Sequence, residues 1–215
     1  GREGQALAWR AGDALLDLQP QLPTVAPILN ALRLPAHYAW TPALDTPEAL
    51  SDLPPPALPR GSLVRLRQPQ WDEADYGRAA PGWCARMQAQ GLRPVLDRPA
   101  ALASAEGVSL HLPAPVAAAL TARPDTPGGW LLVSAHDTAE LNVAAGLQAD
   151  AVVIGHVADT PSHPTAAALG WAGFSALARA AGRPAYAIGG LSPARDAVVA
   201  RTAGAQGIAG IRAYW

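Results

Sequence analysis

The residue best suited to chemistry follows a short apolar run in the C-terminal half of the chain. His156 comes directly after residues 151–155, and the hydroxyl residues Thr160 and Ser162 follow within the next six positions. An imidazole can exchange a proton near neutral pH, and hydroxyl groups can donate hydrogen bonds to phosphate oxygens. This spacing predicts an acid/base group, His156, beside a phosphate-binding loop. The alternative is that His156 only packs at the rim.

Two later loops carry features of an anion-binding site. Gly189 and Gly190 precede Ser192 and Pro193, and Gly210 ends the last apolar run of the chain. Paired glycines allow a backbone to approach a ligand closely. A helix that starts with a serine cap and a proline offers its first amides to phosphate. We therefore predict that these two loops bind a phosphorylated small molecule.

Two arginines lie near the end of an earlier apolar run. Arg65 and Arg67 are two residues apart, so in a strand their side chains point the same way. Converging guanidinium groups suit a phosphate or a carboxylate; the alternative is that they pair with acids such as Asp97. Asp97 itself suits a general base, a metal ligand, or the cap of a helix that begins at Pro99.

Another pair of polar residues ends the apolar run at 130–136. Ser134 and His136 alternate along that run and so share one face. A serine beside a histidine suggests nucleophilic catalysis, but the pattern of a nucleophile elbow is absent from the sequence. We therefore predict that both residues line the ligand pocket.

The elements that must position these residues alternate regularly along the chain. Helical stretches are predicted at 25–34, 72–90, 99–106, 114–122, 138–147, 171–181 and 193–203, with a stunted helix within 45–61. Between them, strands are predicted at 37–41, 62–67, 93–97, 107–111, 130–136, 151–155, 184–189 and 206–211. Such alternation indicates a parallel sheet, either open and doubly wound or closed.

The number of strands decides between these two architectures. Eight strands favour a compact TIM (β/α)8 barrel, here without a helix after the last strand. In such barrels the active site lies at the carboxyl ends of the strands, and the loops after strands 7 and 8 commonly bind phosphate. The candidate residues all follow strands, so we expect them to meet in one pocket.

Composition restricts the class of protein. The formal net charge is −1, which gives no electrostatic basis for a nucleic-acid or membrane-surface partner. All sixteen basic residues are arginines, which excludes a lysine-dependent mechanism. A single cysteine excludes an internal disulfide and fits a reducing compartment, so we expect a cytoplasmic protein. The sequence does not determine the oligomeric state.

Four motifs in register resemble the thiamine phosphate synthase/TenI superfamily over roughly residues 36–215. They are Glu106 to Leu112 (EGVSLHL), Val133 to His136 (VSAH), Ile154 to His163 (IGHVADTPSH) and Ala187 to Leu191 (AIGGL). The resemblance implies the same barrel fold and a role in thiamine metabolism.

The synthase branch of this family joins two phosphorylated substrates with magnesium. Its Gln-Leu-Arg-x-Lys segment is Arg65 to Pro69 (RLRQP) here, which keeps Arg67 and loses the Gln and the Lys. Its Asn-Asp-Arg segment is Leu96-Asp97-Arg98, and its acid after strand 4 has no counterpart. A departing pyrophosphate needs such cations and metal ligands, so residual synthase activity is the lesser alternative.

The TenI branch, which contains thiazole tautomerases, resembles this site better. Its Gly-His-Val segment is reproduced by Gly155-His156-Val157. The resemblance implies that His156 moves a proton on a thiazole carboxylate phosphate without a metal. The rival hypothesis is a catalytically silent module that binds a ligand or supports a neighbouring domain.

The N-terminal residues 1–35 do not join the alternation. They resemble the last strand and helix of a Nudix (MutT-type) hydrolase domain, followed by a linker helix, and the ending Gly207 to Trp215 (GIAGIRAYW) resembles that of Nudix–TenI fusions. We therefore predict a barrel at 36–215 in a fusion with an upstream Nudix domain of the 8-oxo-dGTP diphosphatase type. No cofactor is predicted for this chain; Mg²⁺ is expected only for the Nudix half or a residual synthase.

Overall fold

Eight short apolar runs of the sequence form strands in the computed structural model, which describes residues 25–160 and 167–215. Nearly every strand residue is buried, as expected for parallel strands covered on both faces. The strands are β1 (His37–Trp40), β2 (Leu63–Arg65), β3 (Arg93–Leu96), β4 (Ser109–Leu112), β5 (Leu131–Ala135), β6 (Ala151–Gly155), β7 (Ala185–Ile188) and β8 (Gly207–Gly210).

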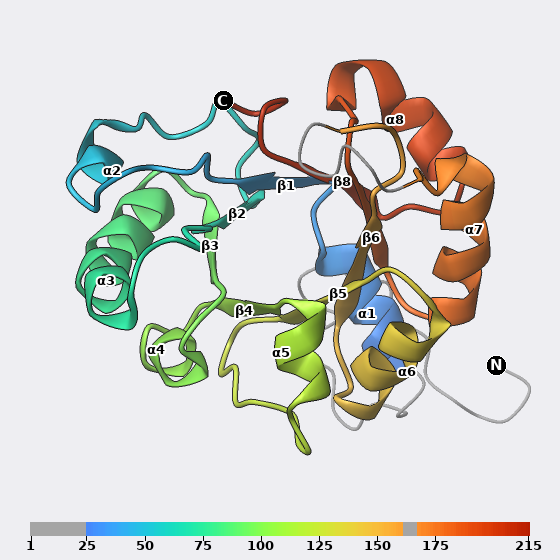
Figure 1. The fold of residues 1–215 in the computed structure, drawn as a ribbon, viewed down its shortest axis with the longest axis horizontal. Helices are drawn as coiled ribbons and strands as arrows, with labels where there is room; N and C mark the ends of the chain where they lie inside the picture. Colours follow the sequence, from blue (N-terminus) through green and yellow to red (C-terminus); the bar gives the residue numbers. More distant parts are fainter. Residues whose placement is uncertain (1–24, 161–166) are drawn as a thin grey trace, which may run out of the picture. The chain divides into compact units, whose positions relative to one another are not determined.

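The strands close into a barrel in the order of the sequence. Each strand pairs in parallel with the next, and β8 returns to β1 with His37 opposite Ile208. Figure 1 shows this ring with helices on its outside. The predicted TIM barrel is confirmed, and the open sheet is excluded by the pairing of β1 with β8.

Helices follow the strands wherever the sequence supplies an apolar stripe or a capping residue. In the longest, Asp72 caps the first turn by accepting a hydrogen bond from the Asp75 amide at 2.8 Å. Among the described residues, one helix follows each strand from β1 to β7: α2 (Ala49–Asp52), α3 (Glu73–Ala89), α4 (Ala100–Ala105), α5 (Ala114–Ala118), α6 (Thr138–Gly146), α7 (Gly170–Ala181) and α8 (Pro193–Thr202).

Most predicted boundaries differ from the observed ones by one or two residues, and two of the differences have a clear structural cause. β4 begins at Ser109 rather than residue 107, because Gly107 has a φ of +62° and the Val108 amide still bonds the Ala103 carbonyl at the end of α4. The helix predicted at 114–122 ends at Ala118, after which the Ala119 amide bonds only three residues back, in a tighter turn. The β4–α5 segment is therefore short and lies close to the barrel mouth.

No helix follows β8 among the described residues, as predicted, and residues 211–215 form turns. These turns are bound to the barrel by two side chains. The Tyr214 hydroxyl donates to the Ile208 carbonyl at 2.7 Å, and the Trp215 indole donates to the Trp40 carbonyl at 2.8 Å. The segment after β8 therefore lies over the ends of β1 and β8, beside the site described below.

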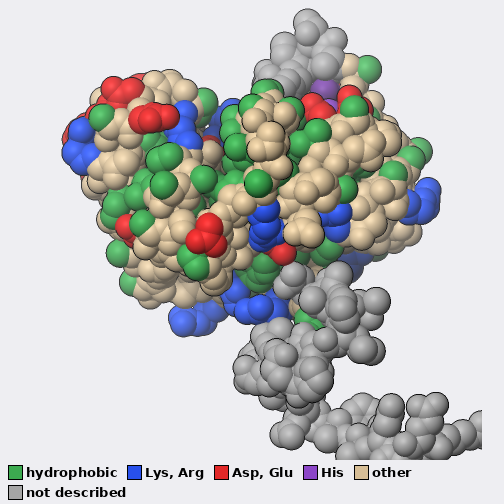
Figure 2. Space-filling model, turned by 90° about the horizontal axis from the view of Figure 1, so that it is seen from below, with side chains coloured by type: hydrophobic (Ala, Val, Ile, Leu, Met, Phe, Trp, Pro, Cys, Tyr) green, Lys and Arg blue, Asp and Glu red, His purple; other side chains and the backbone are tan. Residues whose placement is uncertain are grey.

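The chain divides into two units, Gly1–Leu34 and Pro35–Trp215. The first contains α1 (Val25–Arg33), where a helix was predicted. Residues 1–24 lie outside the described part, so the Nudix resemblance of residues 1–35 stays a prediction. None of the described helices has the length and hydrophobicity needed to cross a membrane. The face in Figure 2 carries both arginines and acidic side chains among many hydrophobic ones.

The helical layer depends on a few large side chains, which gives a test of the packing. Phe174 of α7 is fully buried and contacts Trp171 edge-on at 5.9 Å between ring centroids. We expect Phe174→Ala to lower the free energy of unfolding by about 3–5 kcal/mol, because it leaves a cavity. Val198→Ala in α8, where the side chain is 69% exposed, should change it by no more than about 0.5 kcal/mol in the same urea titration. Equal effects would contradict this packing.

Candidate active site

One large pocket lies at the carboxyl ends of the strands, where a barrel of this kind carries its active site. Its volume is about 1400 Å³. It brings together every predicted site residue that the structure describes, while Ser162 lies outside the described residues. The predicted residues that line it are Arg65, Arg67, Asp97, Ser134, His136, His156, Thr160, Gly189, Gly190, Ser192 and Gly210.

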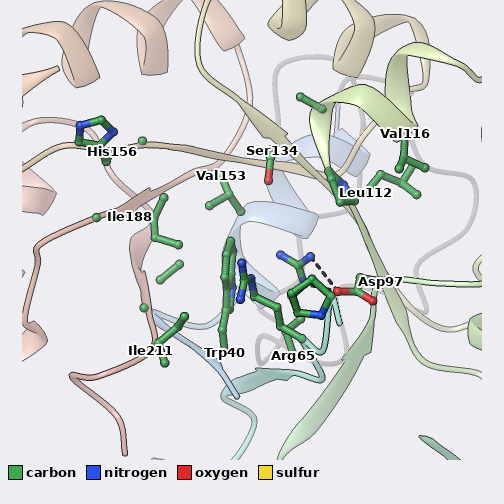
Figure 3. A pocket seen from close by; sticks show the side chains of 18 of the residues that line it. Trp40, Arg65, Asp97, Leu112, Val116, Ser134, Val153, His156, Ile188 and Ile211 are labelled. Atoms are coloured by element: carbon green, nitrogen blue, oxygen red, sulfur yellow. Dashed lines mark hydrogen bonds and ion pairs between the residues drawn. The ribbon is translucent and has the colours of Figure 1, made fainter. Parts of the chain in front are cut away.

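The pocket has two sides of different character, which Figure 3 shows. His156, Ile188 and Ile211 lie on one side, and Asp97, Leu112 and Val116 lie on the other. Arg65 and Trp40 form part of the floor between them.

The backbone conformation and the close packing at positions 189 and 190 require glycine. Their φ angles are +100° and +68°, which favour glycine, and a Cβ on Gly189 would collide with His156 while one on Gly190 would collide with the Asp159 carbonyl. The structure gives these glycines a second reason, because the space at both Cβ positions is occupied by the loop after β6, while their predicted approach to a ligand stays a prediction. The loops after β6 and β7 are packed directly against each other.

His156 is held by its backbone on both sides. The carbonyl of His156 accepts a hydrogen bond from the Leu169 amide at 3.0 Å, and the next amide, of Val157, donates to the Ile188 carbonyl at 2.8 Å. The side chain is half-buried and lines the pocket. Its position at the end of β6 is therefore fixed by neighbouring strands, as a group that reacts with a ligand requires.

The start of α8 differs from the predicted phosphate cradle. Ser192 is the N-cap and Pro193 the first residue, as predicted, but the serine side chain makes no capping bond. Instead the Asp196 carboxylate accepts from the Ser192 amide at 2.8 Å and binds Arg195. The hydrogen bond from Arg195 lowers the pKa of Asp196, so this carboxylate is negative at neutral pH. An anion therefore cannot use the Ser192 amide.

Other donors remain on this side of the pocket. The amides of Gly189 and Gly190 have no acceptor within the part of the chain that the structure describes. The guanidinium of Arg212, just after β8, reaches the Thr160 hydroxyl at 3.4 Å. The sequence reading missed Arg212, although its place directly after the last strand was a usable signal. Arg212 and Thr160 join the loops after β8 and β6 around one possible anion position.

On the other side, a buried ion pair holds the predicted acid. Arg65 Nη2 lies 2.9 Å from Asp97 Oδ2, with side chains only 5% and 10% exposed, and its guanidinium stacks 4.3 Å from the Trp40 ring centroid. Asp97 does not cap α4, whose N-cap is Pro99 with no side-chain bond, so that alternative was wrong. The sequence analysis gave the pairing of Arg65 with an acid such as Asp97 as the alternative to ligand binding, and this ion pair is formed.

Arg67 behaves differently from Arg65. It lines the pocket and makes no ion pair with any described residue. Burial, and then the positive charge of Arg65, lower the pKa of Arg67 from the ordinary arginine value, while the negative charge of Asp97 acts in the opposite direction. Because its guanidinium is not bound in an ion pair, Arg67 can bind a carboxylate or a phosphate of a ligand.

The barrel interior contains a hydrogen-bonded chain that the sequence reading did not assign. The Tyr38 hydroxyl lies 2.7 Å from His111 Nδ1, and His111 Nε2 lies 2.7 Å from the Ser134 hydroxyl. His111 is completely buried. The predicted partner of Ser134, His136, instead contacts Glu140 at 2.8 Å on the exposed rim. The suggested Ser134–His136 catalytic pair is therefore not formed.

A magnesium site of the kind that the resemblance implies for a synthase does not fit these residues. No group of three or more His, Cys, Asp or Glu side chains is placed to hold a metal ion among residues 25–160 and 167–215. The acidic side chains of the pocket are Glu73 and Asp97, and Asp97 is bound to Arg65. We derive no chemical step through a metal.

The Arg65–Asp97 ion pair gives a test by substitution. Removing one partner leaves a buried charge, so Arg65→Met should lower the free energy of unfolding by about 3–5 kcal/mol. Arg65→Met combined with Asp97→Leu should recover most of that loss. Arg78→Met breaks an exposed pair in which Arg78 is 62% exposed, and should cost no more than about 1 kcal/mol. Equal losses of unfolding free energy in Arg65→Met and Arg78→Met would contradict a buried Arg65–Asp97 pair.

His111 gives a test by pH. Burial, and then the charges of Arg65 and Arg67, hold the pKa of His111 well below 6.5, so the native imidazole is neutral. The unfolded chain binds a proton at this residue below about pH 6.5, so stability falls as the pH falls. Between pH 6 and 5, we expect the free energy of unfolding to fall more steeply in the wild type than in His111→Gln. The difference in slope should be up to about 1.4 kcal/mol per pH unit. Parallel pH profiles in urea titrations would refute a neutral His111.

Comparison with known proteins places this geometry in a family. Residues 41–214 match the family described as thiamine monophosphate synthase. A search of curated proteins gave no match. Among solved structures, a thiamine phosphate pyrophosphorylase from Pyrococcus furiosus is similar with a TM-score of 0.61 and 18% identity, over 84% of this chain and 87% of that one.

Two other solved barrels are also similar. FabK from Thermotoga maritima has a TM-score of 0.57 and 15% identity, over 87% of this chain and 61% of that one. An HpcH/HpaI aldolase from Desulfitobacterium hafniense has a TM-score of 0.53 and 12% identity, over 84% of this chain and 87% of that one. Such identities show the fold alone, whereas the family match spans most of the chain. The chain therefore belongs to the thiamine monophosphate synthase/TenI family.

Proposed function

We propose that this barrel binds a phosphorylated thiazole-type small molecule and that His156 moves a proton on it, as in a thiazole tautomerase. The observation that carries the proposal is the composition of one pocket. It contains an imidazole at the end of β6, a cation after β8, Arg212, and a second cation after β2, Arg67. These are the groups needed to hold a phosphate and a carboxylate while a proton is transferred.

The phosphate would bind beside Arg212. The Thr160 hydroxyl and the amides of Gly189 and Gly190 supply further donors on that side of the pocket. A guanidinium bonds phosphate oxygens more strongly than a neutral donor does. Binding there would leave the ring of the ligand over the floor, between Trp40 and Ser134. The carboxylate of the ligand would then face Arg67.

The reaction needs only an acid/base group. His156 takes a proton from one ring carbon of the ligand and returns it to another position of the same ligand, so no atom is gained or lost. The anion formed in between is stabilised by delocalisation into the ring and by nearby cations. The fixed backbone of His156 supports this role because the imidazole keeps its position through both transfers.

We also propose that the barrel works in a fusion with a Nudix hydrolase domain. The resemblance of residues 1–35 to the end of such a domain supports this. The alternative function is a catalytically silent module that binds a ligand without turning it over or supports the Nudix domain. Two observations favour that alternative: Arg65 holds Asp97 in an ion pair, and Asp196 occupies the start of α8.

Substitution of His156 separates these two functions. His156→Gln should lower turnover of the thiazole carboxylate phosphate tautomer by roughly 10²–10⁴-fold, the contribution of a general acid/base. Turnover is followed by NMR as exchange of the ring proton with D₂O. Binding of the ligand, measured by calorimetry, should change little.

The control is Arg78→Met, which alters an exposed pair outside the pocket. Full turnover in His156→Gln would exclude the acid/base role. Wild-type binding without any turnover would support the silent module. Absence of binding by any phosphate would contradict the tautomerase and favour a silent module that supports the Nudix domain.

A further inference from the structure

The side of the pocket opposite His156 is formed by an apolar wall. The wall comes from the end of β4 and from α5 with the turn after it. Figure 3 shows Leu112 and Val116 on this side. We define the wall as Leu112, Pro113, Ala114, Pro115, Val116 and Leu120, all of which line the pocket.

Two side chains of the wall are exposed although they are large and hydrophobic. Val116 is 47% exposed and Leu120 is 38% exposed. Val116 belongs to α5 and Leu120 to the turn that follows it, and both line the pocket. Other exposed large hydrophobic side chains among the described residues, such as Val198 and Val199, do not line the pocket.

The fold does not need these two side chains. α5 packs against the barrel through Ala114 and Ala117, which are 5% and 0% exposed. Exposed apolar side chains that are grouped beside a pocket usually mark a binding surface. Val116 and Leu120 therefore present apolar surface to the pocket that the packing of α5 does not require.

The size of the pocket indicates what covers this surface. Its volume of about 1400 Å³ exceeds the roughly 300–1,000 Å³ of typical small-molecule sites. One five-membered ring with a phosphate and a carboxylate fills only part of such a space. The wall is continuous with the anion-binding side in one cavity, so a single ligand can contact both.

The floor between the two sides supports the same conclusion. Asp97, the acid nearest the wall in Figure 3, is neutralised by Arg65, which in turn stacks on Trp40. This ion pair compensates the Asp97 carboxylate, so Asp97 does not repel a phosphorylated ligand. The wall itself presents apolar surface, and Arg67, Arg98 and the exposed Glu73 are further charged residues of the pocket.

We propose that the wall binds an apolar substituent, alkyl or aryl, carried by the phosphorylated ligand. The substituent packs on Val116, Leu120 and Leu112 while the phosphate binds beside Arg212. This rests on the proposed function for the phosphate, and it specifies the class of substrate: a phosphate ester of a ring with an extended apolar group.

A pair of phosphate esters tests the proposal by calorimetry. The probes are a thiazole ethyl phosphate and the same ester with a benzyl group on the ring, with inorganic phosphate as the reference. Burial of the added group should tighten binding of the benzyl ester about tenfold or more relative to the simple ester. Val116→Asp should abolish that difference and leave the affinity for inorganic phosphate unchanged.

Two control variants make the result specific. Val116→Leu keeps an apolar surface and should retain the preference for the benzyl ester. Val198→Asp places the same charge on α8 at a side chain that is 69% exposed and outside the pocket, and it should have no effect.

Each other outcome has a distinct meaning. Equal affinity of the wild type for both esters would overturn the apolar subsite and leave the phosphate site intact. Loss of phosphate binding in Val116→Asp together with a lowered Tm would show that the wall supports the fold, which also overturns the proposal. Failure of every phosphate to bind the wild type would instead overturn the proposed function.

Discussion

The guanidinium of Arg65 determines the character of the whole pocket. It neutralises Asp97 at 2.9 Å, stacks on Trp40 and contributes to the low pKa of His111. A buried cation of this kind is stable only when its partner is present, so Arg65, Asp97 and Trp40 form one unit on the floor. The ion pair leaves this part of the floor without net charge. It lies between the side of the pocket that contains Arg212 and the side formed by the apolar wall.

Most of the fold could be predicted because parallel strands buried on both faces are nearly continuous apolar runs. The run at 151–155 gave the bounds of β6 without error, and the helix from 193 began as its serine and proline indicated. The boundary at β4 failed because Gly107 continues the end of α4 in a left-handed conformation. That conformation depends on how α4 packs, so it cannot be predicted from the alternation of apolar and polar residues.

The position of the site could be predicted, but the partners inside it could not. Every described candidate residue lines one pocket because each follows a parallel strand. Which groups pair depends on distances across the barrel: Ser134 bonds His111 of the neighbouring strand rather than His136 two residues on. In the same way, Gly189 and Gly190 are required by the packed loop after β6, a neighbour that is far away in the sequence.

Membership of the family determines the architecture, and the residues of this pocket limit the chemistry that it supports. A reaction that expels pyrophosphate needs several cations and metal-bound carboxylates close to the leaving group. Here Arg65 holds Asp97, and no group of three possible metal ligands exists in the described part of the chain. Proton transfer on an already phosphorylated ligand needs less: one imidazole, one anchored anion and a surface for the remainder of the molecule. The proposed roles of His156, the Arg212 side and the wall of α5 meet these requirements without a metal-bound carboxylate.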